Sequence, residues 1–189
     1  VLELKKDVQL SVNSAIFKSE IISKNNVIFG EDIKPNFEDA HFVATYLIHF
    51  SQEKVAFVKS AQYFYRKRSD GSSTLDRAWE KPSLYNIVLE KGCLDLLRRY
   101  KKEKGNIPEF IQITNLYHLI WYFKKLINNT HKLNFLSDVE KQEFLQLVDE
   151  IFEHIDVKTI MEFSLADCWF YHKVGLLGAF KHQEPANQI

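Results

Sequence analysis

The sequence predicts an α/β segment followed by an all-α helical segment, in a chain that is mostly helical overall. Hydrophobic residues make up 46% of the 189 residues, which is ample material for a folded core. Up to about residue 79, short runs rich in β-branched and aromatic residues alternate with one amphipathic stretch. From about residue 81 the apolar residues recur at helical spacing. We therefore expect one unit over residues 1–79 and a helical unit over residues 80–189.

The first unit combines predicted strands with two predicted helices. Residues 8–18, 54–58 and 62–67 have the β-branched and aromatic density of strands. A short helix is expected over residues 20–23. Apolar side chains spaced by three and four predict a longer amphipathic helix over residues 38–50. The order of strand, helix, strand and strand is typical of part of an α/β sheet.

The second unit is expected to contain four helices. The first ends near Gly105, and the second, over residues 110–127, is apolar on nearly every face and should be central and buried. Ser137 and Glu140 have the spacing of a capping box and predict the start of the third helix. The last helical stretch is expected over residues 165–181.

Composition excludes several classes of protein. Lys and Arg (25) balance Asp and Glu (25), so a general nucleic-acid-coating role is excluded and we expect no nucleic-acid partner. Cys93 and Cys168 lie far apart without a CxxC pair, and the seven histidines show no i,i+4 pair, so we expect no metal site in this chain. No apolar run reaches the roughly 18 residues that a membrane helix needs. These features predict a cytoplasmic protein.

Two consecutive carboxylates, Glu38 and Asp39, stand at the predicted start of the amphipathic helix, within the motif FEDAHF. One interpretation is structural, because acidic residues at a helix N-terminus satisfy free backbone N–H groups and complement the helix dipole. The other is functional: one carboxylate acts as a general base, held ionised by those N–H groups and directed at an acceptor hydroxyl.

A basic strand with a hydroxyl-rich turn is the second candidate site, within YFYRKRSDGSST. Strand alternation places Arg66 and Arg68 on one face, next to Ser72, Ser73 and Thr74. Arginine binds phosphate through two parallel hydrogen bonds, and backbone N–H groups in a turn can form an anion-binding hollow. The alternative is a solvated basic edge strand that discourages association between sheets.

Taken together, these segments resemble a known family. The stretches NSAIFKSEII, KPNFEDAHFVATYL and KVAFVKSAQYFYRKRSDGSST look like the acceptor-side half of the catalytic domain of bacterial family 2 glycosyltransferases. The stretches PSLYNIVLEKGCLDLLRRY and IPEFIQITNLYHLIWYFK resemble the helical extension of the capsule and cell-surface polysaccharide members. The resemblance implies part of a nucleotide-diphospho-sugar transferase-like sheet, followed by a helical domain.

The resemblance also implies roles for individual residues. Asp39 would be the base of an inverting sugar transfer from a nucleotide-sugar donor to a glycan acceptor, and Glu38 its acceptor-binding neighbour. Arg66 and Arg68, with the hydroxyls that follow them, would lie near the donor diphosphate. No Asp-x-Asp metal motif and no Gly-rich nucleotide-binding half occur in the sequence. We therefore expect a divalent metal, Mg or Mn, only in a longer parent protein and none bound by this chain.

The start at Val1 and the single Met161 lead us to expect a piece of a longer polypeptide, inactive by itself. The rival hypothesis is a non-catalytic helical interaction module that holds a partner enzyme, with an acidic helix start that is only a cap. The basic run over residues 98–104 is read as a solvated helix end or as a dock for anionic lipid head groups. The second reading would give peripheral contact with the inner face of the plasma membrane.

Overall fold

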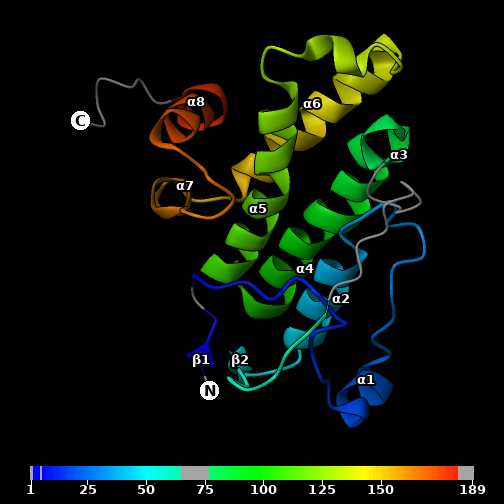
Figure 1. The fold of residues 1–189 in the computed structure, drawn as a ribbon, viewed down its shortest axis with the longest axis vertical. Helices are drawn as coiled ribbons and strands as arrows, with labels where there is room; N and C mark the ends of the chain where they lie inside the picture. Colours follow the sequence, from blue (N-terminus) through cyan, green and yellow to red (C-terminus); the bar gives the residue numbers. More distant parts are fainter. Residues whose placement is uncertain (1, 5, 65–76, 183–189) are drawn as a thin grey trace.

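The computed structural model describes residues 2–4, 6–64 and 77–182 and shows a helical molecule (Figure 1). Its longest helix, α5, lies between α7 and α8 on one side and α4 on the other, whereas α6 packs against the helical stretch of residues 82–94 and against α8. The α-helices are α1 (Ser19–Asn25), α2 (Glu38–Leu47), α3 (Pro82–Tyr85), α4 (Asp95–Lys104), α5 (Glu109–Leu126), α6 (Asp138–Glu153), α7 (Val157–Glu162) and α8 (Phe170–Lys181). A π-helix (Val88–Leu94) and short 3₁₀-helices (Ala78–Glu80 and Thr130–Leu133) complete the helical structure.

Within these described residues, β-structure is limited to β1 (Leu2–Glu3), which pairs antiparallel with β2 (Lys54–Val55). Residues 8–18, which we expected to form a strand or strand pair, contain none. A strand requires a neighbour for its N–H and C=O groups, and the backbone of this segment is bonded by side chains of α2 instead. Residues 65–67 of the third expected strand lie outside the described residues, so the partial α/β sheet stays a prediction.

Helix α5 forms the centre of the core, as its all-round apolar pattern predicts. Seven consecutive residues, from Phe110 to Leu116, are buried, which a helix with one solvent face could not achieve. Near its other end, the buried Tyr122 hydroxyl donates a 2.8 Å hydrogen bond to the Leu84 carbonyl oxygen. The predicted helix over residues 110–127 and its central position are therefore confirmed.

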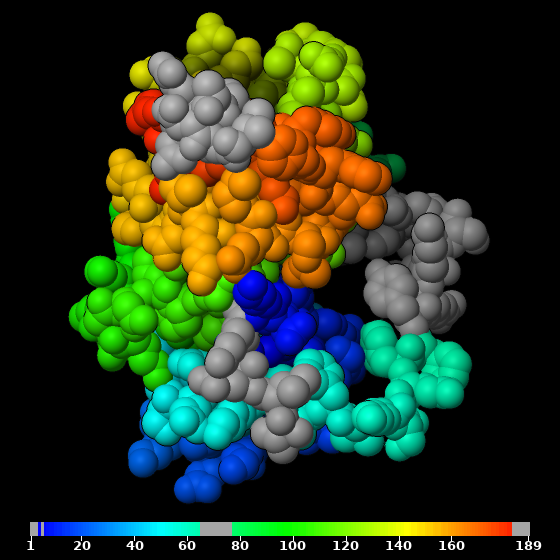
Figure 2. Space-filling view, turned by 90° about the vertical axis from the view of Figure 1, so that its left-hand side faces the viewer, coloured from blue at the N-terminus to red at the C-terminus, as the bar shows by residue number. Residues whose placement is uncertain are grey.

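The hydrophobic core is continuous across the predicted boundary between residues 79 and 80. Helix α2 packs against α4, and the buried Tyr100 hydroxyl donates a 2.9 Å hydrogen bond to the Ala44 carbonyl oxygen. The N-terminal segment also connects distant parts of the chain. Lys6 Nζ lies 2.6 Å from a carboxylate oxygen of Glu162 at the end of α7, and Figure 2 shows this blue segment between α2 and the C-terminal helices. The division into two units stays a prediction.

The helix expected over residues 81–105 consists of three pieces. Asn86 interrupts it with non-helical backbone angles, because its side-chain oxygen accepts the N–H of Ile87 and competes with helical hydrogen bonding. The wider turns of the π-helix follow, and α4 then ends at Gly105, whose φ of 76° forms a left-handed C-cap. The predicted end at Gly105 is therefore confirmed, whereas the predicted continuity is wrong.

The C-terminal helices also differ from the expected single stretch over residues 165–181. Helix α8 begins only at Phe170, because Ala166 and Asp167 adopt positive φ angles that end any regular helix there. Helix α7 precedes this turn and was not predicted. None of the described helices combines the length and the apolar character needed to cross a membrane.

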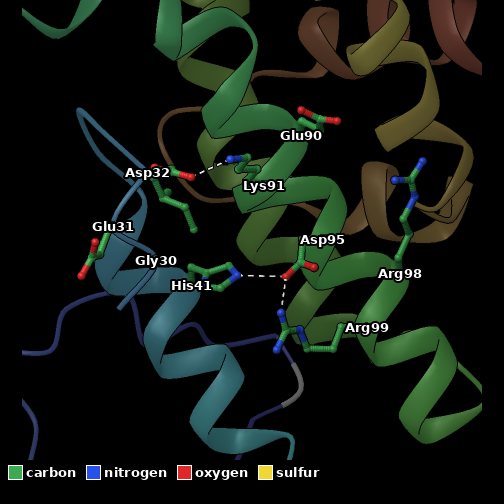
Figure 3. A pocket seen from close by; sticks show the side chains of 10 residues that line it. Gly30, Glu31, Asp32, His41, Glu90, Lys91, Asp95, Arg98 and Arg99 are labelled. Atoms are coloured by element: carbon green, nitrogen blue, oxygen red, sulfur yellow. Dashed lines mark hydrogen bonds and ion pairs between the residues drawn. The ribbon is translucent and has the colours of Figure 1, made fainter. Parts of the chain in front are cut away.

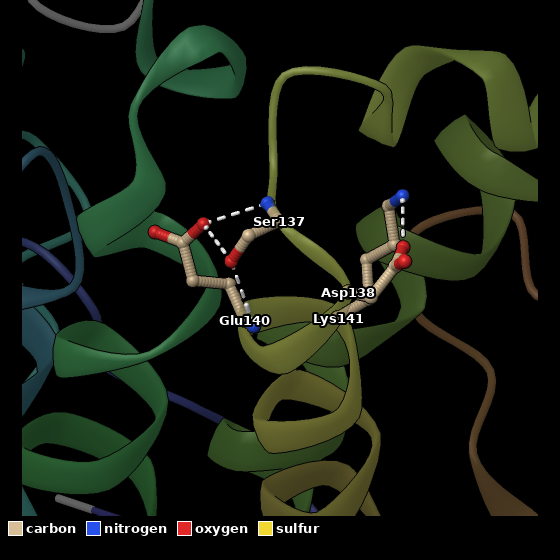
Figure 4. A network of polar contacts seen from close by, with 4 residues as sticks. All are labelled: Ser137, Asp138, Glu140 and Lys141. Atoms are coloured by element: carbon tan, nitrogen blue, oxygen red, sulfur yellow. Dashed lines mark hydrogen bonds and ion pairs between the residues drawn. The ribbon is translucent and has the colours of Figure 1, made fainter.

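The capping box at the start of α6 is present as predicted (Figure 4). The backbone N–H of Glu140 donates a 3.3 Å hydrogen bond to the Ser137 hydroxyl oxygen. The Glu140 carboxylate accepts the backbone N–H of Ser137 at 2.7 Å. Two N–H groups that the helix cannot satisfy by itself thereby gain partners.

Substitution Ser137→Ala removes the acceptor for the Glu140 N–H, and we expect it to lower the free energy of unfolding by about 1 kcal/mol. Chemical denaturation of the purified chain measures this. The control Ser137→Thr keeps a hydroxyl acceptor and should lose far less. Equal stability of the alanine variant and the unmodified chain would show that the box does not stabilise α6.

Candidate active site

The acidic start of α2 holds the N-terminal segment of the chain. The Asp39 carboxylate accepts the backbone N–H of Val12 at 3.1 Å, and the Tyr46 hydroxyl accepts that of Lys18 at 3.0 Å. Asp39 and Tyr46 are seven residues apart and so share one face of the helix. Between these two bonds, Phe17 packs edge-on against the Tyr46 ring, with centroids 5.0 Å apart. The segment from Val12 to Lys18 therefore lies along α2.

Packing of Phe37 fixes where α2 begins. Phe37 is the N-cap and has a φ of 76°, a region that bulky residues rarely adopt and that costs of order 1–3 kcal/mol. The side chain is buried, and its ring centroid lies 4.7 Å from that of His118 on α5. On the π-helix, a Cβ placed on Gly92 would lie 2.9 Å from Phe37 Cδ1, so only glycine leaves room for this ring. The first turn of α2 is thus packed between α5 and the π-helix.

The two carboxylates of this first turn have different surroundings. Glu38 is half-buried, and burial is the main cause that raises its pKa above the ordinary value, with the neighbouring Asp39 charge adding to the effect. Asp39 is also half-buried, and one of its oxygens is engaged by Val12. The Asp39 carboxylate therefore binds the N–H of a distant segment and does not act only on its own helix. The arrangement is an acidic pair at a partly exposed surface, with one carboxylate held in place.

The structure brings only part of the predicted site together. Glu38 and Asp39 lie in the first turn of α2, as predicted. The predicted diphosphate-binding residues lie outside the described residues, and their proximity to the acidic pair stays a prediction: Arg66, Arg68, Ser72, Ser73 and Thr74. Among the residues that the structure describes, no group of three or more His, Cys, Asp or Glu side chains could hold a metal ion.

A polar network next to this site was not predicted. His41, the histidine of the FEDAHF motif, is buried on α2, and its Nε2 lies 3.1 Å from Asp95 Oδ2 on α4. Arg99 donates a 2.8 Å hydrogen bond to the same oxygen (Figure 3). Burial alone would raise the pKa of Asp95, but the hydrogen bond from His41 and the Arg99 guanidinium hold it below its ordinary value.

This network forms one wall of a surface hollow of about 410 Å³. One turn before Asp95 on the same helical run, Lys91 forms an exposed ion pair with Asp32, with atoms 2.6 Å apart. The hollow therefore contains both signs of charge and does not favour an anion over a cation. Sequence spacing could not have revealed the network, since Asp95 lies 54 residues beyond His41. A histidine within a run of apolar helix residues was the only available signal.

Comparison with known proteins finds relatives whose names refer to teichoic acid biosynthesis. The chain is 32% identical over 163 residues to "Minor teichoic acid biosynthesis protein GgaB" of Bacillus subtilis (strain 168), covering 84% of this chain and 17% of that protein. It is 23% identical over 186 residues to "Minor teichoic acid biosynthesis protein GgaA" of the same organism, covering 98% of this chain and 40% of that protein. The chain thus spans less than half the length of either relative. No family model matches the chain, and no solved structure matches it.

His118, which packs against Phe37 at the start of α2, is an ionisable group that makes the stability of the fold depend on pH. The Tyr122 hydroxyl donates its only hydrogen to the Leu84 carbonyl oxygen. His118 Nε2, which lies 3.1 Å from the Tyr122 oxygen, is therefore the donor in the hydrogen bond between them. Burial lowers the pKa of His118 from 6.5 to about 3, so the folded chain keeps this imidazole neutral.

Below pH 6.5 the unfolded chain takes up a proton at His118 that the folded chain does not bind. We therefore expect the free energy of unfolding to fall as the pH falls from 6.5 towards 4, with a contribution approaching about 1.4 kcal/mol per pH unit. Denaturation of the chain and of the His118→Phe variant at several pH values measures it. The variant keeps a ring against Phe37 and should show the shallower slope; parallel slopes would contradict the assignment.

Proposed function

We propose that this chain is the acceptor-side part of an inverting glycosyltransferase that builds a cell-surface glycan. The proposal rests mainly on the acidic pair Glu38–Asp39. The pair lies at the partly exposed start of the buried helix α2 and directly follows the strained N-cap residue Phe37. A residue held in a sparsely populated backbone conformation by its surroundings is a common feature of active sites. The names of the two relatives support the class of product, a wall-associated polymer.

In this proposal Asp39 is the general base. The N–H of Val12 binds Oδ2 and restricts rotation of the carboxylate, which leaves Oδ1 for the proton of an acceptor hydroxyl. Removal of that proton makes the acceptor oxygen nucleophilic towards the anomeric carbon of a nucleotide-sugar. Glu38, one residue away and half-buried, would hold a second hydroxyl of the acceptor. Its raised pKa also makes it the alternative base.

The donor side of the reaction depends on residues outside the described part of the chain. Arg66 and Arg68, with Ser72, Ser73 and Thr74, would bind the diphosphate and stabilise it as the leaving group. The described residues do not form a metal site, so no step of this proposal runs through a metal ion. The nucleotide-sugar, the glycan acceptor and any Mg or Mn belong to the proposed longer enzyme.

The substitution Asp39→Asn separates a base from a structural hydrogen-bond acceptor. Asparagine keeps an oxygen for the Val12 N–H but cannot take up a proton at neutral pH. In a polypeptide that carries this chain together with a donor-binding half, we expect turnover to fall by about 10²–10⁴ while the Tm changes by only a few degrees. Sugar transfer from a nucleotide-sugar donor to the glycan acceptor is the measurement.

The matched control is Glu38→Gln, which makes the same chemical change one residue earlier. If Asp39 is the base, Glu38→Gln should alter the KM for the acceptor more than kcat. If Glu38→Gln abolished turnover while Asp39→Asn kept near-normal turnover, Glu38 would be the base. Near-normal turnover in both would leave the acidic pair with a structural role and favour the interaction-module hypothesis.

The basic strand gives a separate prediction. If Arg66 and Arg68 bind the donor diphosphate, Arg66→Ala or Arg68→Ala should weaken transition-state binding by about 1.5–3 kcal/mol per charged hydrogen bond lost. The effect should appear in kcat/KM for the donor, with the KM for the acceptor and the Tm nearly unchanged. If the double variant showed an unchanged kcat/KM for the donor, the alternative interpretation of these residues as part of a solvated edge strand would be favoured.

A further inference from the structure

Three consecutive aromatic residues at the start of α8 are exposed to solvent. Trp169, Phe170 and Tyr171 are exposed by 64%, 57% and 67%, and we call them the aromatic triplet. The orange segment that contains the start of α8 lies on the face of the molecule shown in Figure 2. These three rings expose a large apolar area to water, which lowers the solubility of the protein. Exposed apolar patches of this kind often mark interaction sites.

The triplet is held in position from both sides. On the chain before it, the Ala166 carbonyl oxygen accepts a 2.9 Å hydrogen bond from Lys124 Nζ on α5. On the chain after it, the buried His172 accepts the backbone N–H of Trp169 on Nδ1, at 3.0 Å. Burial lowers the pKa of His172, which favours the neutral imidazole that can accept this bond. The exposed rings therefore sit on a fixed turn.

Two lysines, Lys124 and Lys173, lie near the triplet. Lys124 Nζ donates to the Ala166 carbonyl oxygen and Lys173 Nζ donates to that of Met161 at 2.6 Å; because both acceptors are neutral, the two ammonium groups keep their net charge. The first turn of α8 contains no acidic residue, and the exposed Asp167 precedes the triplet by two residues. Aromatic rings next to lysines, whose long stems reach from apolar to polar surroundings, suit the head-group region of a membrane that contains anionic lipids.

We propose that the aromatic triplet inserts into the surface of an anionic membrane and, with Lys124 and Lys173, attaches this chain to it. Consecutive residues at a helix start point about 100° apart. Their rings therefore cannot form one flat platform for a glycan, but all three can enter a fluid interface. This attachment does not depend on sugar transfer, and it assigns membrane contact to α8.

The basic run 98–104, which the sequence suggested for this contact, is less suited to it. Arg98 pairs with Glu150, Arg99 with Asp95, and Lys104 Nζ lies 3.5 Å from Glu53. Cations already paired within the fold have less to gain from lipid phosphates. No exposed aromatic residue lies within this run.

The test is sedimentation of the 189-residue chain with vesicles of phosphatidylcholine, with and without 30% phosphatidylglycerol (about a third, enough to give a clear negative surface potential). The triple variant Trp169→Ser, Phe170→Ala, Tyr171→Ala should bind the anionic vesicles at least about tenfold more weakly. Serine is a good N-cap and alanine a good helix former, so α8 should be retained, as circular dichroism would confirm.

Two matched variants make the result specific. Phe57→Ala, Tyr63→Ala, Phe64→Ala removes three exposed aromatic rings elsewhere on the chain and should bind like the unmodified protein. Lys101→Ala, Lys102→Ala removes charge from the basic run and should have little effect. Equal binding by the triplet variant would overturn the proposal. So would a loss confined to the lysine variant, or binding to soluble glycan and not to vesicles.

A second measurement does not depend on the folding of the triplet variant. In the background Trp79→Phe, Trp121→Phe, Trp169 is the only remaining tryptophan. Its fluorescence should shift to the blue on addition of anionic vesicles and be quenched by brominated acyl chains. Vesicle binding without quenching would show that another surface makes the contact and would also overturn the proposal.

Discussion

The seating of Phe37 between α5 and the π-helix is the constraint on which the rest of the described structure depends. Its ring occupies space that a side chain at Gly92 would fill, and it packs against a neutral His118. This packing compensates a positive φ at a bulky residue, and it thereby fixes the residue at which α2 begins. Because α2 is buried along nearly its whole length, its start also sets the position of every side chain that it contributes to the core and to the surface.

The same helix organises the chain on two sides at once. On one face, Asp39 and Tyr46 bind the backbone of the N-terminal segment. On another, His41 meets Asp95 and Arg99, and Tyr100 bonds back to the α2 backbone. Polar contacts of this kind are directional and favour one register of α2 against its neighbours, which the apolar contacts alone would leave less well defined. The acidic first turn therefore lies on a well-anchored helix, as the proposed active site would require.

The sequence predicted local features well and long-range ones poorly. The capping box of Ser137 and Glu140, the C-cap at Gly105 and the buried α5 all follow from spacing within one element, and the structure contains each of them. The break at Asn86 and the turn at Ala166 and Asp167 depend on side-chain competition and on left-handed backbone, which periodicity does not report. The pairing of His41 with Asp95 depends on packing between helices far apart in sequence. The acidic pair was found because its two members are adjacent, whereas its tie to Val12 was not.

The hydrogen bond between the Val12 N–H and Asp39 distinguishes this acidic pair from a simple helix cap. A carboxylate that only capped α2 would turn back to its own backbone, and a base free in solution would have to be oriented at each turnover. Asp39 does neither, because the Val12 N–H binds one of its oxygens; in the proposed reaction this bond would orient the carboxylate before an acceptor arrives. The neighbouring Glu38 differs in its environment, since burial raises its pKa. Two adjacent carboxylates whose surroundings differ in this way can divide the work of proton removal and acceptor binding, which two equivalent ones could not.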